Sequence, residues 1–151
     1  MPWTEASTGR WERHPDLAEE AFLAFATATA DLGRGHFDAI TTIKLNITTV
    51  PDTVDIESAL RRAWKHLRFK KPHLASTVED GKFVYQVPDD SALEEWLQET
   101  FLVSAASNAE ELYQTFNTTI KRPVLFYIPK SSELMLRADH CRIDGVGNML
   151  I

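Results

Sequence analysis

A helical stripe of apolar residues in the middle of the chain constrains its fold more than any other feature. The stripe comprises Ile56, Ala59, Leu60, Ala63, Trp64 and Leu67. Side chains spaced by three and four residues lie on one face of an α-helix. A face of this kind is stable when another element buries it, so we expect this helix to pack on a β-sheet.

Two segments near this helix have the pattern of strands. Residues 43–47 alternate apolar and polar side chains, which predicts a strand with one buried face. Residues 74–78 and 83–87 flank Asp80 and Gly81. Because this dipeptide suits the positive φ angles of a two-residue turn, we predict a hairpin here.

A second hairpin and several short helices complete the pattern. Residues 124–128 and 134–138 are apolar and surround a short connection containing a proline and two serines, which predicts another hairpin. Ser91 and Ser107 each precede a glutamate by three residues, the spacing of a capping box, and predict helix starts. Trp64 and Trp96 are expected in the core.

The N-terminal part is predicted to contain an irregular segment followed by a helix. Residues 1–15 contain Pro2, Gly9 and Pro15 and show no sustained periodicity, which predicts an irregular arm. Asp16 and Glu19 have capping-box spacing, and the apolar residues that follow predict a helix to about Leu32, ending at Gly33. The fold class is therefore α/β, with a mixed, largely antiparallel sheet and packed helices.

Composition excludes several classes of function. The net charge of -6 argues against non-specific nucleic-acid binding, and no apolar run approaches the length of a membrane span. Cys141 is the single cysteine, so an intrachain disulfide and a multi-cysteine metal site are excluded. The N-terminus lacks a secretory signal, which favours a cytoplasmic protein. The other histidines are scattered, and we expect no metal site.

The strongest chemical signal lies in the run H-x-x-x-D-G, formed by His140, Asp144 and Gly145. A histidine just beyond a strand is held by the sheet while its ring meets solvent or substrate. Histidine ordinarily titrates near about 6.5, which suits proton abstraction near neutral pH. Asp144 could turn back toward His140 or form a structural ion pair, and Gly145 permits a tight turn or a close backbone approach.

On these residues the chain resembles acyltransferases of the chloramphenicol-acetyltransferase-like fold, which include condensation domains, plant BAHD enzymes and fungal trichothecene acetyltransferases. The resemblance extends to the run 59–64 and to the segment 71–74, in the order typical of the N-terminal part of fungal members. One departure is Asp139, which stands where a condensation domain usually has its first histidine.

The resemblance implies a role for each residue of the motif. His140 would deprotonate a hydroxyl or amine of a small metabolite that attacks a thioester, with acyl-coenzyme A as co-substrate and no bound cofactor. Asp144 would be mainly structural, pairing with an arginine of a later segment, and Gly145 would keep the channel beside His140 open. Coenzyme-binding residues would come largely from later segments and are unknown here.

The resemblance also implies an organisation. Residues 1–151 would form the N-terminal subdomain of a two-subdomain fold whose C-terminal subdomain is absent, so we expect a fragment or one chain of a split enzyme. The isolated chain would be inactive without a second polypeptide or the missing half. Two alternatives stay open: a non-catalytic interaction module, and a cyclase or isomerase that uses the same histidine.

Cys141 invites a competing interpretation, because it follows His140 directly. Adjacent residues of a strand point to opposite faces, so a nucleophilic pair of thiol and imidazole is disfavoured. We expect a small buried thiol instead. One basic cluster is expected to be a solvated helix face, with a docking patch for an anionic cofactor or carrier as the alternative; it comprises Arg61, Arg62, Lys65, Arg68, Lys70 and Lys71.

Overall fold

Helices and strands alternate along the chain in a computed structural model that describes residues 2–29, 38–46 and 54–142. Within these ranges the elements are, in chain order, β1 (Thr4–Ser7), β2 (Arg10–Arg13), α1 (Leu17–Ala28), β3 (Asp38–Lys44), α2 (Ile56–Lys70), the 3-10 helix η2 (Pro72–Ala75), β4 (Thr77–Glu79), β5 (Lys82–Gln86), α3 (Asp90–Thr100), β6 (Phe101–Val103), α4 (Ala109–Tyr113), β7 (Val124–Ile128) and β8 (Glu133–Asp139). No helix of this described part is long and apolar enough to cross a membrane.

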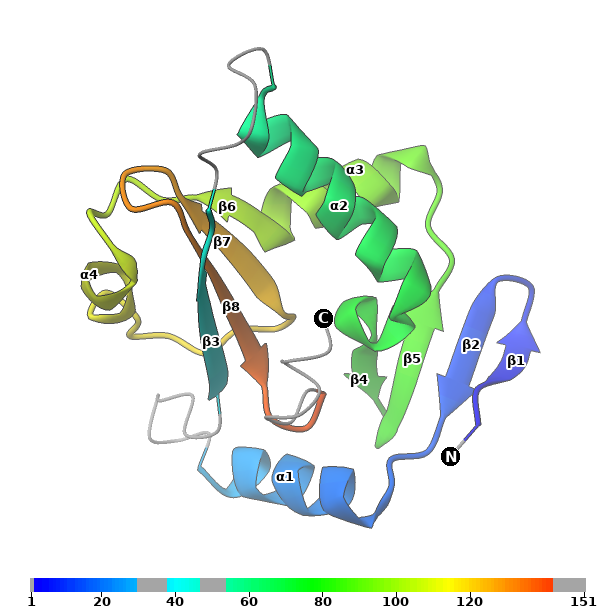
Figure 1. Ribbon diagram of the computed structural model, residues 1–151. Helices are drawn as coiled ribbons and strands as arrows, with labels where there is room; N and C mark the ends of the chain where they lie inside the picture. Colours follow the sequence, from blue (N-terminus) through cyan, green and yellow to red (C-terminus); the bar gives the residue numbers. More distant parts are fainter. Residues whose placement is uncertain (1, 30–37, 47–53, 143–151) are drawn as a thin grey trace.

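The strands form two four-stranded sheets, shown in Figure 1. The first has the order β1-β2-β5-β4 and is antiparallel throughout; the second has the order β3-β8-β7-β6. In the second sheet β6 runs parallel to β7, while the other pairs are antiparallel. The predicted α/β class with mixed, largely antiparallel pairing is confirmed, although the strands divide between two sheets.

The prediction of an irregular arm for residues 1–15 is wrong over β1 and β2. These two strands form a hairpin, in which Gly9 takes a positive φ of 73°, and β2 pairs with β5. Ion pairs join the strands across the sheet, from Arg10 to Glu79 and from Lys82 to Glu12, each at 3.0 Å. Because these partners come from distant segments, local periodicity did not reveal the pairing.

The predicted helix after Asp16 is confirmed, with a capping box at its start. The Asp16 carboxylate accepts a hydrogen bond from the Glu19 backbone N–H at 2.9 Å, and the Asp16 N–H donates to the Glu19 carboxylate at 2.8 Å. The helix ends at Ala28, earlier than Leu32. The predicted break at residues 33–35 lies outside the described residues.

Both predicted hairpins are present, with one change. Asp80 and Gly81 have φ angles of 48° and 73°, which confirms the two-residue turn between β4 and β5. The segment before β4 starts instead as the 3-10 helix η2, whose Leu74 is fully buried. The hairpin of β7 and β8 is confirmed, with Ser132 at a φ of 54° in the connection.

Two predicted helices are present but begin at other residues. The side chain of Asp89 caps α3 by accepting from the Ala92 N–H at 2.8 Å, and Asn108 caps α4 by accepting from the Glu111 N–H at 2.9 Å. Ser91 and Ser107 are therefore not the caps. The strand expected at residues 43–47 is β3, which begins earlier because it pairs with β8 from Asp38 onward; Ile47 lies outside the described residues.

The main core lies between α2, α3 and the inner faces of both sheets. Its centre is a pair of stacked indoles, Trp64 and Trp96, with ring centroids 5.6 Å apart and exposures of 2% and 1%. The expectation that both lie in the core is confirmed. A second, smaller cluster on the other face of the β3–β8–β7–β6 sheet contains Leu112 of α4 and Met135. Alternation along β8 therefore divides its side chains between two cores.

Candidate active site around His140

His140 lies immediately after the last residue of β8. The strand pairs with β3 as far as Asp139 opposite Asp38, so the sheet holds the backbone up to the residue before the histidine. The side chain of His140 is partly buried. Its ring stacks on Phe22 of α1, with centroids 4.2 Å apart and an interplanar angle of 22°. The Nδ1 atom is buried and has no hydrogen-bond partner among the described residues.

The residues flanking His140 form a local ion pair. Arg142 pairs with the Asp139 carboxylate, and its backbone N–H donates to the Asp139 carbonyl at 3.0 Å. Burial lowers the pKa of Arg142 to about 10, with a smaller contribution from the charge of Arg122. The guanidinium remains charged at neutral pH. Asp139 thus has a structural partner in the described part of the chain.

The first turn of α1 is joined to β2 by an ion pair. Arg13 holds Glu19 through two hydrogen bonds of 2.6 and 2.5 Å. The Glu19 carboxylate raises the pKa of both His73 and Cys141 electrostatically, in each case less strongly than burial acts on them. In Figure 1, α1 lies near the end of β8, in agreement with the stack of Phe22 on His140.

His73 is a second histidine of this region, contributed by η2. Burial lowers its pKa below the ordinary value, and the positive charges of Lys71 and Arg13 lower it further. The imidazole is therefore neutral at neutral pH. His73 is partly buried.

Cys141 is a buried thiol, as expected from its place beside His140. Burial raises its pKa to about 11 from an ordinary 9.0, and the charge of Glu19 adds to the shift. The reactive form of cysteine is the thiolate, so a thiol with this pKa is a poor nucleophile at neutral pH. The structure therefore does not support a nucleophilic pair of Cys141 and His140.

This burial predicts slow alkylation of Cys141 in the folded protein. At pH 8 a pKa of about 11 leaves roughly 100-fold less thiolate than an ordinary pKa of 9.0. We expect iodoacetamide to modify the native thiol at least that much more slowly than the urea-unfolded thiol, as followed by intact mass. Equal rates in the two states would show that the thiol is accessible and ionised in the fold.

The structure does not place the other two residues of the motif. Asp144 and Gly145 lie outside the described residues. The sequence pattern singled out His140 as a candidate base. It did not predict the contact of His140 with Phe22 or the pairing of Arg13 with Glu19. No local signal marks these residues, because Phe22 belongs to an apolar helix and Arg13 to a segment without periodicity. Among the described residues, no group of three or more histidine, cysteine or acidic side chains could hold a metal ion.

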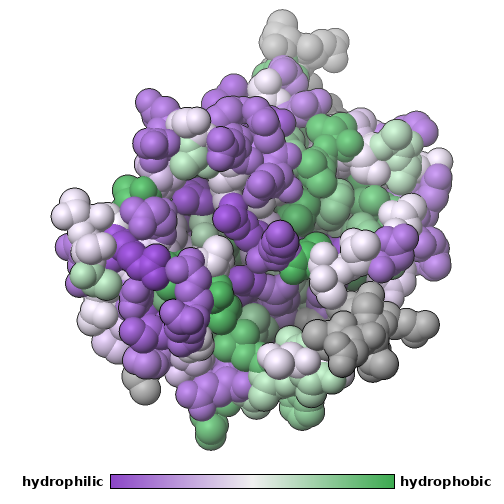
Figure 2. Space-filling view, turned by 180° about the vertical axis from the view of Figure 1, so that it is seen from behind, coloured by the Kyte–Doolittle hydropathy of each residue, from purple (hydrophilic) through white to green (hydrophobic). Residues whose placement is uncertain are grey.

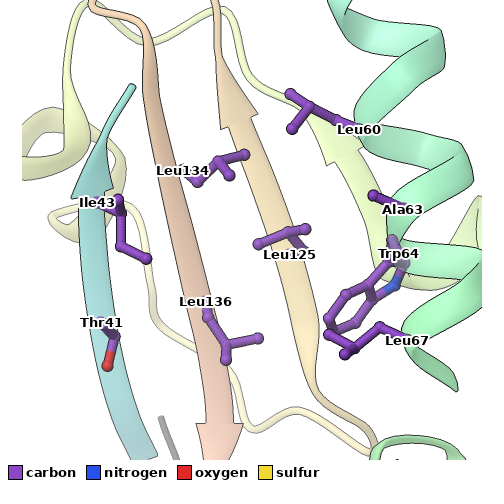
Figure 3. Close-up of a pocket in the computed structure, with 9 residues that line it drawn as sticks. All are labelled: Thr41, Ile43, Leu60, Ala63, Trp64, Leu67, Leu125, Leu134 and Leu136. Carbon is purple, nitrogen blue, oxygen red and sulfur yellow. The ribbon is translucent and has the colours of Figure 1, made fainter. Parts of the chain in front are cut away.

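An apolar pocket of about 280 Å³ lies away from His140, between α2 and the second sheet. Leu60, Ala63, Trp64 and Leu67 project from α2 toward Thr41, Ile43, Leu125, Leu134 and Leu136 of the strands (Figure 3). The predicted stripe of α2 therefore faces a sheet, as expected, but does not fill the space against it. Ile43 in its wall is 53% exposed.

Apolar side chains also reach the outer surface. Leu17 and Phe25 of α1 are 84% and 55% exposed, and Phe69 at the end of α2 is 50% exposed. Seen from behind, the surface is mostly hydrophilic, with hydrophobic residues gathered in separate areas (Figure 2). Contiguous apolar surface is typical of a contact with another molecule or another part of the same protein.

Comparison with known proteins gives curated relatives over nearly the whole chain, although no protein-family model matches it. The O-acetyltransferase pigM of Monascus ruber is 31% identical over 100% of the chain, and the acetyltransferase pigO of the same fungus is 29% identical over 99%. The loline biosynthesis cluster 1 transcription factor lolU1 of Epichloe uncinata is 30% identical over 96%.

These relatives are much longer than the chain. It spans 29% of pigM, 33% of pigO and 31% of lolU1. A solved structure, the TRI3 trichothecene 15-O-acetyltransferase of Fusarium sporotrichioides, matches 97% of the chain and 35% of its own length with a TM-score of 0.68 and 19% identity, a likeness that shows the fold. The resemblance inferred from the sequence is thus confirmed: the chain is similar to fungal acetyltransferases over nearly its whole length and has the fold of part of TRI3.

Proposed function

We propose that this chain supplies the general base for acyl transfer from a thioester to a hydroxyl or amine of a small metabolite. The observation that carries the proposal is the position of His140, at the end of a central strand, in a chain whose relatives pigM and pigO are named acetyltransferases. A partly buried imidazole that follows a central strand and packs on a helix is suited to proton transfer.

In the proposed reaction, His140 takes the proton of the acceptor hydroxyl or amine. The acceptor oxygen or nitrogen attacks the thioester carbonyl and forms the new ester or amide bond. The carbon–sulfur bond then breaks, and the thiol of coenzyme A leaves with the proton that the imidazolium returns. Acyl-coenzyme A is thus a co-substrate, and the chain itself needs no bound cofactor for this step.

Asp144 and Gly145 have supporting roles in the proposal. Asp144 is structural and pairs with an arginine of a later segment, while Gly145 leaves room beside His140 for the acceptor. Both roles come from the resemblance of the H-x-x-x-D-G run, since neither residue belongs to the described part of the chain. We place the reaction in the cytoplasm, in keeping with a chain whose single cysteine, Cys141, is a buried free thiol.

The working site needs a complementary half in this proposal. Support comes from the size of the relatives, of which the chain spans about a third. The exposed Leu17 and Ile43 and the open apolar pocket provide surfaces for a second polypeptide or a further segment. Residues that bind coenzyme A would lie in that complementary half.

A non-catalytic interaction module is the alternative. The same apolar surfaces favour it, because they suit the binding of a protein partner without any chemistry at His140. The name of the third relative, a transcription factor, also does not describe an acetyltransferase. The two proposals differ in whether thioester-dependent activity appears once the partner is present.

Co-purification followed by an acetyl-transfer assay tests the proposed function. Tagged chain is isolated from its source, any second polypeptide is identified, and both are assayed with acetyl-coenzyme A and a panel of hydroxylated and amino-bearing metabolites. We expect acetylated product, detected by mass, from the assembly and none from the isolated chain. A chain that purifies without any second polypeptide, or an assembly that forms no acetylated product, would contradict the proposal and favour the interaction module.

A further inference from the structure

The aromatic contact between α1 and the candidate base joins two distant parts of the sequence. Phe22 lies in the middle of α1, and its ring stacks on the His140 imidazole with a centroid separation of 4.2 Å and a 22° angle. Both side chains are partly buried. The contact places a flat apolar surface against one face of the imidazole and so restricts the rotation of that ring.

Few other described interactions orient this imidazole. The ladder of β8 with β3 ends at Asp139, one residue earlier. The buried Nδ1 atom of His140 has no hydrogen-bond partner among the described residues. In many sites a hydrogen bond to one ring nitrogen sets the orientation of the other. Among the described contacts of His140, the stack on the Phe22 ring can set the orientation of the imidazole.

The helix that carries Phe22 is itself held from the first sheet. Arg13, at the end of β2, binds Glu19 by two short hydrogen bonds, and its guanidinium lies 5.3 Å from the Trp3 ring centroid and 4.4 Å from that of Phe83. Glu19 and Phe22 are three residues apart and therefore neighbours on one side of the helix. In Figure 1, α1 lies across one end of both sheets.

We propose that Phe22 is a positioning residue, which holds the His140 imidazole in the orientation for proton transfer. The proposal rests on the proposed function, in which His140 is the base. Helix α1 has a specific role in this proposal. Arg13 ties the helix to the first sheet, and the helix places the Phe22 ring against His140 at the end of β8 in the second sheet. Phe22 acts through His140 and need not touch the substrate.

The first arm of the test compares three variants of the complete assembly. Phe22→Leu removes the ring and keeps an apolar side chain, Phe22→Tyr keeps the ring, and Phe25→Leu is the matched control on the same helix, where the side chain is 55% exposed. With acetyl-coenzyme A as donor, we expect Phe22→Leu to lower kcat by about 10- to 100-fold with little change in KM, since misplacement of a catalytic group has effects of this size. Phe22→Tyr and Phe25→Leu should keep kcat within about twofold of the parent.

The second arm detects the stack without any assay of activity. A ring stacked on an imidazole shields its protons, so the NMR signals of the His140 ring should lie upfield in the parent and in Phe22→Tyr. They should return to ordinary positions in Phe22→Leu but not in Phe25→Leu. Far-UV circular dichroism and Tm confirm that each variant is folded, and Phe22→Met replaces Phe22→Leu if that variant is not.

Several results would overturn the positioning role. One is a Phe22→Leu kcat near that of the parent; another is equal loss in Phe22→Tyr or in Phe25→Leu, which would indicate a general effect on α1. The proposed function fails separately: turnover retained by His140→Ala rejects the base and the positioning role together. Loss in His140→Ala with full activity in Phe22→Leu rejects the positioning role alone.

Discussion

His140→Ala is expected to lower acyl transfer by about 10²- to 10⁴-fold, the usual contribution of a general base. The loss should be in kcat more than in KM, because the imidazole acts on the proton in the transition state. The variant should stay folded. The Nδ1 atom has no described hydrogen-bond partner to leave unsatisfied, and the ring's stack on Phe22 lies at a partly exposed site.

The measurement is steady-state turnover of the complete assembly with acetyl-coenzyme A and an identified acceptor. His66→Ala is the matched control, because His66 lies on α2 and is exposed. It should leave kcat unchanged. Near-normal turnover by an assembly that carries His140→Ala would rule out His140 as the base.

Trp64→Ala is expected to cause the largest loss of stability, about 3–5 kcal/mol in the free energy of unfolding. The indole is 2% exposed, stacks on Trp96 and donates a hydrogen bond from Nε1 to the Thr100 hydroxyl at 3.0 Å. Trp64 also lines the apolar pocket of about 280 Å³. Its truncation would therefore enlarge a space that the helix and sheet already fail to fill.

Urea unfolding followed by circular dichroism measures this loss. A domain is typically stable by only about 5–15 kcal/mol, so the variant should unfold at much lower urea or be unfolded without it. Trp11→Ala is the control, because it removes the same side chain from β2, where Trp11 is 36% exposed. If both variants lost the same stability, the stacked pair would not be the centre of the core.

Local sequence signals predicted the elements whose determinants lie within a few residues. The apolar stripe of α2, the Asp80–Gly81 turn and the capping box at Asp16 all proved correct. Each depends on a helical period, a turn geometry or a cap that neighbouring residues supply. The same holds for the hairpin that delivers His140.

Elements stabilised by distant partners were not predictable in this way. The hairpin of β1 and β2 is held against β5 and by the ion pairs of Arg10 with Glu79 and Glu12 with Lys82, so its own sequence shows no strand pattern. The parallel pairing of β6 with β7 also has no local signature. The caps of α3 and α4 were missed because Asp89 and Asn108, which also favour the cap position, lie within two residues of the serines that match the motif.

By itself, the sequence determined the α/β class, the core tryptophans and the identity of the candidate base, because period, turn chemistry and a short motif are local properties. Tertiary structure alone decided that the strands form two sheets and that Phe22 stacks on His140. It also decided how far burial raises the pKa of Cys141, a thiol that the sequence already predicted to be buried. Packing between segments far apart in the chain sets these features, and composition or spacing within one segment carries no record of that packing.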